Sequence, residues 1–154
     1  MRPTNNIGYL MQHLASVLAK QSDQVLQEQL GIGFSQFKIL MALQWNPHTQ
    51  QRHIAESLGQ TEASISRQIK LMLDRGLLQS QVSPKSRREH LTTPTAKGIK
   101  LTEAAREVLN QYHGPMFENL GDKERQQLLE SLISMHQYTC RTGKIAACQH
   151  PLGI

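Results

Sequence analysis

The sequence predicts a mainly α-helical protein that carries one small β-hairpin. Apolar residues recur at helical spacing along most of the 154 residues, and glycine and proline residues divide this pattern into segments. One stretch, 77–93, instead fits two short strands on either side of a basic turn. Hydrophobic residues make up 38% of the chain and aromatic residues 5%, which is thin for a self-contained core of this length. We therefore expect long amphipathic helices that finish burying their apolar faces against a second copy of the chain.

Two helices are expected at the N-terminal end. The first is long and amphipathic, spans about residues 5–29, and ends at two glycines, Gly31 and Gly33. The second begins at Ser35, whose hydroxyl can cap it, and continues until an Asn-Pro dipeptide at 46–47 breaks the pattern.

Two shorter helical patterns follow, with a tight turn between them. The first spans about residues 51–58 and ends at Gly59, a residue that tolerates the left-handed conformation. Thr61 can cap the second, which Gly76 stops. A helix, a short turn that contains glycine, and a second helix form the helix-turn-helix pattern.

A hairpin is expected directly after this second helix. Its strands are placed at 77–82 and 89–93, and a basic turn joins them at 83–88. Pro94 ends the hairpin, and Thr95 can cap the next helix. A hairpin in this position is the wing of a winged helix-turn-helix.

The C-terminal third is expected to hold two further helices. The first runs from Thr95 to about Tyr112, and Gly114 and Pro115 should kink or interrupt it. The last starts near residues 121–122. The predicted fold class is therefore mainly α with a small β-hairpin wing. It is a winged helix-turn-helix module (35–98) between an N-terminal dimerisation helix (1–34) and C-terminal dimerisation helices (99–154).

The net charge of +5 is concentrated in the middle of the chain. Residues 52–100 contain nine basic and four acidic residues, and the remainder contains eight of each. A surface of mixed, solvated charge would not concentrate its excess in this way, whereas a nucleic-acid-binding module between neutral scaffolding would. Double-stranded DNA is therefore the expected partner.

The second helix of the helix-turn-helix has the faces that a recognition helix needs. Ile65, Ile69 and Met72 share one face and should be buried, while small residues near the N-terminus of the helix allow close approach to the major groove. Arg67 is the expected base reader, because a guanidinium can pair with guanine O6 and N7. Taken alone, this surface could also be an ordinary solvated helix face, and the wing could be a soluble basic turn. The predicted DNA contacts are Ser64, Ser66, Arg67, Gln68, Lys70, Lys85, Arg87 and Arg88.

These segments resemble the MarR family of transcription regulators. The resemblance lies in IAESLG at 54–59, SISR at 64–67 and LDRGLL at 73–78, followed by SRR at 86–88 and PTAKG at 94–98. The order and spacing of the motifs match over nearly the whole chain. Two positions depart from the family pattern: the usual aspartate of the wing is Ser86, and the usual leucine before Thr95 is Pro94.

The resemblance implies a homodimer that presents two winged modules to a palindromic operator. Half-sites would then lie about 10 bp apart. It also implies repression, released by a small aromatic or phenolic ligand bound between the dimerisation helices and the DNA-binding module. The ligand would act by changing the spacing of the two recognition helices.

Two alternatives stay open beside this interpretation. Cys140 and Cys148 could form the switch of a thiol-redox-responsive regulator, although structural thiols are favoured. The winged helix could also serve protein–protein contacts, but that use would not explain why the module carries the whole net charge.

Other classes of function are not expected. The sequence has no phosphate-binding glycine loop, nucleophile elbow or paired-carboxylate arrangement, so we expect no enzyme and no cofactor. The seven histidines include no pair four residues apart and no cluster with the spacing of a zinc site, so we expect no metal. The start of the chain lacks a secretory signal, and no apolar run approaches a membrane span, which favours a soluble, cytoplasmic protein without a membrane partner.

Overall fold

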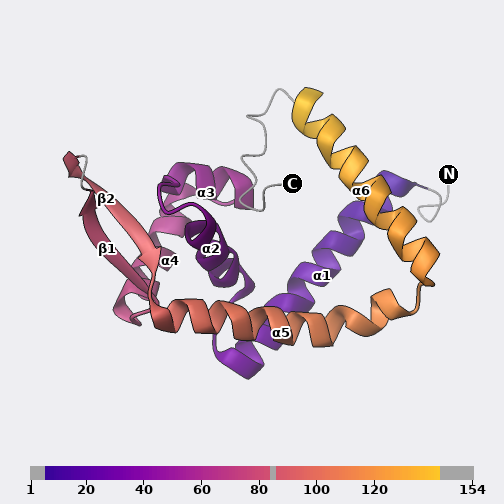
Figure 1. Cartoon of the computed structure of the whole chain (residues 1–154), viewed down its shortest axis with the longest axis horizontal. Helices are drawn as coiled ribbons and strands as arrows, with labels where there is room; N and C mark the ends of the chain where they lie inside the picture. The colour runs from indigo at the N-terminus through magenta and orange to yellow at the C-terminus, as the bar shows by residue number, and fades with distance from the viewer. Residues whose placement is uncertain (1–5, 84–85, 143–154) are drawn as a thin grey trace.

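The computed structural model of the chain describes the backbone of residues 6–83 and 86–142 and the side chains of residues 6–83 and 91–139. This part of the chain forms helices and one antiparallel hairpin, as the sequence predicts (Figure 1). In chain order the elements are α1 (Ile7–Leu30), α2 (Phe34–Trp45), α3 (Gln51–Leu58), α4 (Glu62–Asp74), β1 (Leu78–Ser83), β2 (Ser86–Pro94), α5 (Ala96–Glu118) and α6 (Asp122–Thr142).

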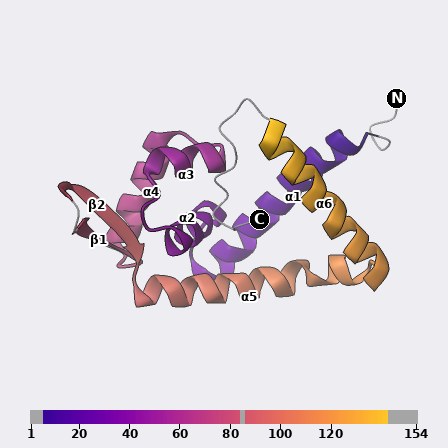
Figure 2. The ribbon, with the colours of Figure 1, turned by 45° about the horizontal axis from the view of Figure 1, so that its top comes forward.

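The other elements are arranged along the long helix α5 (Figures 1 and 2). The hairpin and α2–α4 gather at its N-terminal end, and α6 leaves its C-terminal end. Helix α1 crosses α5 and packs against it. In that contact the Oγ atom of the buried Ser22 lies 3.0 Å from Nε2 of His113. The hairpin and α2–α4 therefore lie together at one end of the long helices.

The hydrophobic core lies where α2, α3, α4 and the hairpin meet the ends of α1 and α5. Leu40 and Leu43 of α2 and Ile54 of α3 are almost fully buried there, together with Ile65 and Met72 of α4. Burying a side chain of this size contributes about 1.5–3 kcal/mol. The core therefore fixes α4 from one side only and leaves its other side exposed.

The hairpin is longer than the sequence predicts. Its register pairs Leu78 with Pro94 and Val82 with His90, and an irregularity after Val82 lets Ser83 pair with Ser86. The returning strand therefore begins at Ser86 rather than at residue 89. The prediction that residues 86–88 belong to the turn is wrong, because strand pairing continues past the register shift to Ser83 and Ser86.

Two further details of the sequence prediction are corrected. Ser35 does not cap α2, because Gly33 occupies the N-cap position. The free N–H of Phe34 donates instead to the Asp23 carboxylate of α1, with an N···O distance of 2.8 Å. Pro115 does not interrupt α5, which continues to Glu118. The proline removes one helical hydrogen bond, but only one turn follows, and the bond from Asn119 N to Pro115 O, 3.1 Å long, closes that turn.

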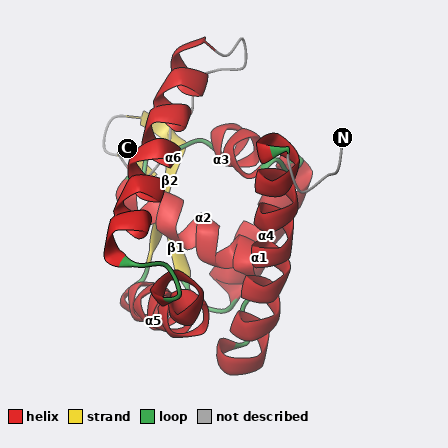
Figure 3. Ribbon diagram, turned by 90° about the vertical axis from the view of Figure 1, so that its right-hand side faces the viewer, coloured by secondary structure: helices red, strands yellow, loops and turns green. Residues whose placement is uncertain are grey.

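Helix α6 stands apart from the core. It has no buried residue among its described side chains, 122–139. Figure 3 shows α1 and α6 on opposite sides of the view, so their overlap in Figure 1 is not a contact along their length. Within residues 6–83 and 86–142, no helix has the length and apolar character needed to cross a bilayer.

Candidate nucleic-acid interface

Helix α4 separates its residues into a buried and an exposed face, as the sequence predicts. Ile65, Ile69 and Met72 are at most 4% exposed and hold the helix against the core. The opposite face is open to solvent and carries small, polar and basic side chains. Its exposed members include Ala63, Ser66, Arg67, Lys70 and Leu71.

The turn before α4 places the N-terminus of the helix at the surface. Gly59 ends α3 with φ of 62°, in the left-handed region that glycine adopts without strain. Thr61 then caps α4, accepting a hydrogen bond from the backbone N–H of Ser64 at 3.2 Å. The free N–H groups and the helix dipole make such a terminus favourable for an anion such as a phosphate.

Two of the predicted contact residues take part in a side-chain network. Gln68 donates from Nε2 to Oε1 of Gln60 at 3.0 Å, and the Ser64 hydroxyl donates to the same oxygen at 3.4 Å. Gln60 in turn donates to Oγ of Ser35 in α2 at 2.6 Å. The structure therefore groups Ser64 and Gln68 at one edge of α4, beside the exposed Arg67.

Sequence reasoning missed Gln60, although its position between the glycine that ends α3 and the threonine that caps α4 marks it as part of the turn. No motif indicates that its side chain faces α2 and α4, because that contact depends on how the helices pack.

Two of the predicted contacts of the wing fall near the start of β2. The backbone of Arg87 and Arg88 belongs to β2, while their side chains lie outside the described residues. Lys85 lies outside the described residues altogether. The hairpin projects from the end of α4 in Figures 1 and 2, so its tip lies away from the long helices.

Part of the positive charge of the middle third holds the module together. Nη1 of Arg75, at the end of α4, donates to the carbonyl oxygen of Gly31 at 3.1 Å. Lys97 of α5 donates from Nζ to the carbonyl oxygen of Arg75 at 2.9 Å. Thr95 caps α5 and also donates to the carbonyl oxygen of Gly76 at 2.7 Å. These bonds join the last turn of α4 to α1 and α5, so Arg75 and Lys97 are structural cations.

Lys38 is another cation with a partner inside the module. Its Nζ lies 4.9 Å from the centroid of the Phe34 ring on the same helix. Burial lowers the pKa of Lys38 below its usual value, because the charged form loses solvation. Its charge is therefore directed at a ring within α2 rather than at an outside partner.

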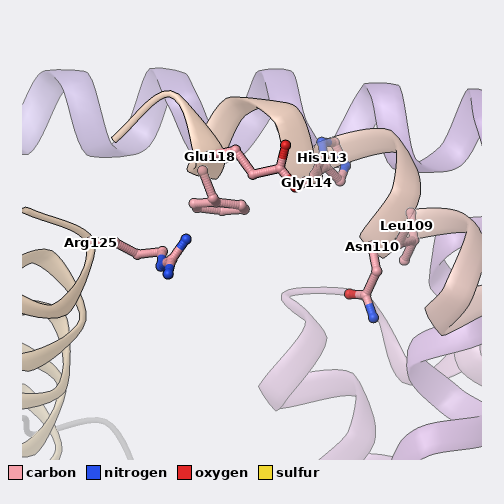
Figure 4. Close-up of a pocket in the computed structure, with 7 residues that line it drawn as sticks. Leu109, Asn110, His113, Gly114, Glu118 and Arg125 are labelled. Carbon is pink, nitrogen blue, oxygen red and sulfur yellow. The ribbon is translucent and has the colours of Figure 1, made fainter. Parts of the chain in front are cut away.

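Cavities of the described chain lie away from the exposed face of α4. One of about 400 Å³ occupies the corner between α5 and α6 (Figure 4). Leu109 and Phe117 supply apolar lining, while Asn110, His113 and Arg125 supply polar groups. A smaller cavity of about 150 Å³ lies between the α2–α3 connection and β2.

The described residues offer little for metal or redox chemistry. No group of three or more His, Cys, Asp or Glu side chains within them is placed to hold a metal ion. The side chain of Cys140 and all of Cys148 fall outside the described part of the chain.

The fold and the exposed face together define the class of the protein. The chain is a winged helix-turn-helix protein. Its helix-turn-helix is anchored in the core, a hairpin follows the second helix directly, and long helices flank both.

Comparison with known proteins shows a likeness to one family of regulators over the middle of the chain. Residues 30–89 match the sequence model of the MarR family. No curated protein sequence matches the chain. The match covers α2 to the start of β2, and the chain shares its fold with solved structures of MarR-family proteins.

Solved structures show the same fold. CouR from Rhodococcus jostii RHA1, bound to p-coumaroyl-CoA, is 23% identical, with a TM-score of 0.70 over 88% of this chain and 94% of its own. Rv2887 from Mycobacterium tuberculosis, in complex with salicylic acid, is 22% identical, with a TM-score of 0.74 over 84% and 96%. MepR from S. aureus, in complex with DNA, is 24% identical, with a TM-score of 0.68 over 86% and 97%. At these identities the likeness concerns the fold.

Proposed function

We propose that the protein is a sequence-specific transcription repressor that binds operator DNA as a homodimer. The observation that carries this proposal is that α4 has two distinct faces. One face is buried in the core, and the other exposes Ser66, Arg67 and Lys70 to solvent. A rigid helix with a long guanidinium on its open face suits direct readout in the major groove. MepR, which shares the fold, is in complex with DNA.

Each part of the module has its own role in this proposal. Arg67 reads a base edge, and Ser64, Ser66, Gln68 and Lys70 contribute base or phosphate contacts. On the wing, Lys85, Arg87 and Arg88 contact the DNA backbone or the adjacent minor groove, where arginine is favoured by the negative potential.

Exposed apolar side chains support the homodimer. Ile7, Leu10 and Leu14 of α1 are 42–70% exposed and lie on one face of that helix. A second stripe on α6 consists of Leu128, Leu129, Leu132 and Met135, which are 42–51% exposed. Such contiguous apolar surfaces mark an interaction site. We propose that a second copy covers both stripes, so that residues 1–34 and 99–154 serve dimerisation and residues 35–98 bind DNA.

A twofold dimer would present two copies of α4 to the same side of a duplex. The operator is therefore palindromic in this proposal, with half-sites about 10 bp apart. Selection of bound duplexes from a random library tests the idea. It should return an inverted repeat with that spacing. A library that stays random after selection would contradict sequence-specific binding.

A small aromatic or phenolic ligand is the proposed effector, and one that carries a carboxylate suits this chain. CouR and Rv2887 have bound p-coumaroyl-CoA and salicylic acid. In this chain, the cavity of Figure 4 combines an apolar wall with the Arg125 guanidinium. Nη2 of Arg125 already donates to the Asp122 carboxylate, and its other N–H groups can pair with the carboxylate of a ligand. Its volume lies within the range of small-molecule sites. A molecule bound there would change the angle between α5 and α6, and with it the spacing of the two recognition helices.

Calorimetry with salicylate as the probe tests this site. The parent should release heat on binding and lose affinity for its operator, and Arg125→Gln should weaken salicylate binding at least tenfold. Equal binding of salicylate by the parent and the variant would place the effector elsewhere.

A further inference from the structure

Gln60 joins three side chains from two helices at the edge of the exposed face of α4. Its Nε2 donates to Ser35 of α2, and its Oε1 accepts from Ser64 and Gln68 of α4. All of these contacts are partly buried, so water competes with them less than at an open surface.

In the structure, the Gln60 amide turns its Nε2 toward Ser35 of α2 and its Oε1 toward α4. The oxygen and the NH2 group of an amide lie in one plane and point in different directions, so each can meet a different helix. With the Nε2 group bound to Ser35 at 2.6 Å, the Oε1 atom points to α4, where it can only accept. Gln68 must therefore offer its own Nε2 to Gln60, at 3.0 Å.

This arrangement fixes the orientation of the Gln68 amide. One hydrogen of its Nε2 is used by Gln60, which leaves the second hydrogen and Oε1 for an outside partner. An adenine offers the complementary pair in the major groove, since its N7 accepts and its N6 amino group donates. A glutamine free to rotate its amide would lose part of this preference.

We propose that Gln60 is a positioning residue, which holds the Gln68 amide in the orientation that reads an adenine. The inference rests on the proposed function, because it assigns a base preference to one side chain of the DNA-binding face. The side-chain hydrogen bonds of Gln60 go to Ser35, Ser64 and Gln68, so Ser66, Arg67 and Lys70 should keep their own contacts when Gln60 is replaced.

Four variants separate positioning from a merely structural role. Gln68→Leu removes the reader, and Gln60→Leu removes its support. Gln60→Glu keeps an oxygen that accepts from Gln68, and the Ser35 hydroxyl can donate to the other carboxylate oxygen. Gln24→Leu, on α1, makes the same chemical change outside the module, where the exposed Gln24 side chain donates to Glu28 of the same helix.

The measurement is competition binding of the full-length protein to its selected operator and to operators with single base-pair changes. The parent and Gln24→Leu should prefer adenine at one position of each half-site by about tenfold or more, from the 1–3 kcal/mol of a bidentate contact. Gln68→Leu and Gln60→Leu should lose that preference at the same position and keep the others. Gln60→Glu should retain it, with weaker binding overall because the added charge repels phosphates.

Three results would overturn the inference. Gln60→Leu could keep the preference that Gln68→Leu loses, or Gln68→Leu could change no preference at all. Gln60→Leu could also weaken every duplex, including a scrambled one, by the same factor, which would show a structural role. A parent that prefers no duplex over another would overturn the proposed function itself, and so the two failures are distinguishable.

Discussion

Arg67 lies on the exposed face of α4, and no ion pair among the described side chains includes it. Lys97 and Arg75, by contrast, donate hydrogen bonds to backbone carbonyl groups. At the scale of single residues, the basic side chains therefore divide into those that hold the module and those that are open to a partner.

Replacing Arg67 with alanine should weaken binding to the selected operator by about 1–3 kcal/mol and blur the preference at one base pair. The physical reason is the loss of a bidentate contact to a base edge. Fluorescence anisotropy with the operator and its single-base variants measures both effects. Arg106→Ala, an arginine of α5, is the matched control and should bind as the parent does. If Arg67→Ala kept the affinity and the base preference of the parent, the assignment would be wrong.

Gly98 is required by the close approach of α5 to the start of the hairpin. A Cβ atom there would overlap the carbonyl oxygen of Leu77 and lie 3.3 Å from Cδ2 of Leu40. We expect Gly98→Ala to lower the free energy of unfolding by about 1–3 kcal/mol, since the packed core must shift. Urea denaturation measures this change.

Gly114 of the same helix provides the control for Gly98. Nothing lies within 4 Å of a Cβ added to Gly114. Gly114→Ala should therefore raise the free energy of unfolding by about 0.5–1 kcal/mol, as expected within a helix. A Gly98→Ala protein as stable as the parent would show that the α5–hairpin contact adapts easily.

The sequence alone predicts local residue roles better than tertiary ones. Thr61 and Thr95 were predicted as caps, and both accept the expected N–H, because a cap depends on a few neighbouring residues. Ser35 was predicted as a cap and is not one, since the carboxylate that replaces it comes from α1, eleven residues before Phe34. The role of Gln60 could not be predicted, because it depends on the packing of α2 against α4.

The hairpin and α5 show the same limit at the scale of elements. Alternation and turn residues predict that a hairpin follows α4, but the bulge after Val82 decides where β2 begins. Pro115 predicts a break in α5, yet the helix tolerates it because only one turn follows. The existence and order of all the elements were predicted, and their ends depend on contacts that local sequence does not contain.

The wing should contribute affinity more than specificity. We expect Arg88→Ala to weaken the operator and a scrambled duplex by similar factors, because a phosphate contact carries little sequence information. The slope of log K against log salt should fall by about 1. Anisotropy titrations over a range of salt concentrations test this. A loss confined to the operator would instead indicate that Arg88 reads a base.

At the scale of the whole molecule, the exposed apolar stripes of α1 and α6 form the interface of the proposed dimer. The fold of one chain leaves Leu132 42% exposed, so replacing it with glutamate removes little from the core of the single chain. The same charge would be buried in the proposed dimer. We therefore expect Leu132→Glu to produce a monomer that binds the operator at least a hundredfold more weakly, because one half-site contributes alone.

Ser134→Glu places the same charge on the opposite side of α6 and is the control. It should remain dimeric by analytical ultracentrifugation and bind as the parent does. A dimeric Leu132→Glu protein would mean that the stripe on α6 does not form the interface.

The central claim is that the open face of α4 gives sequence-specific DNA binding. The most direct test titrates the purified protein against its selected operator and a scrambled duplex, by fluorescence anisotropy at two salt concentrations. The protein should prefer the operator by at least about a thousandfold and lose affinity steeply as salt is added. No binding to either duplex at low salt would contradict it and would favour a winged helix used for protein contacts.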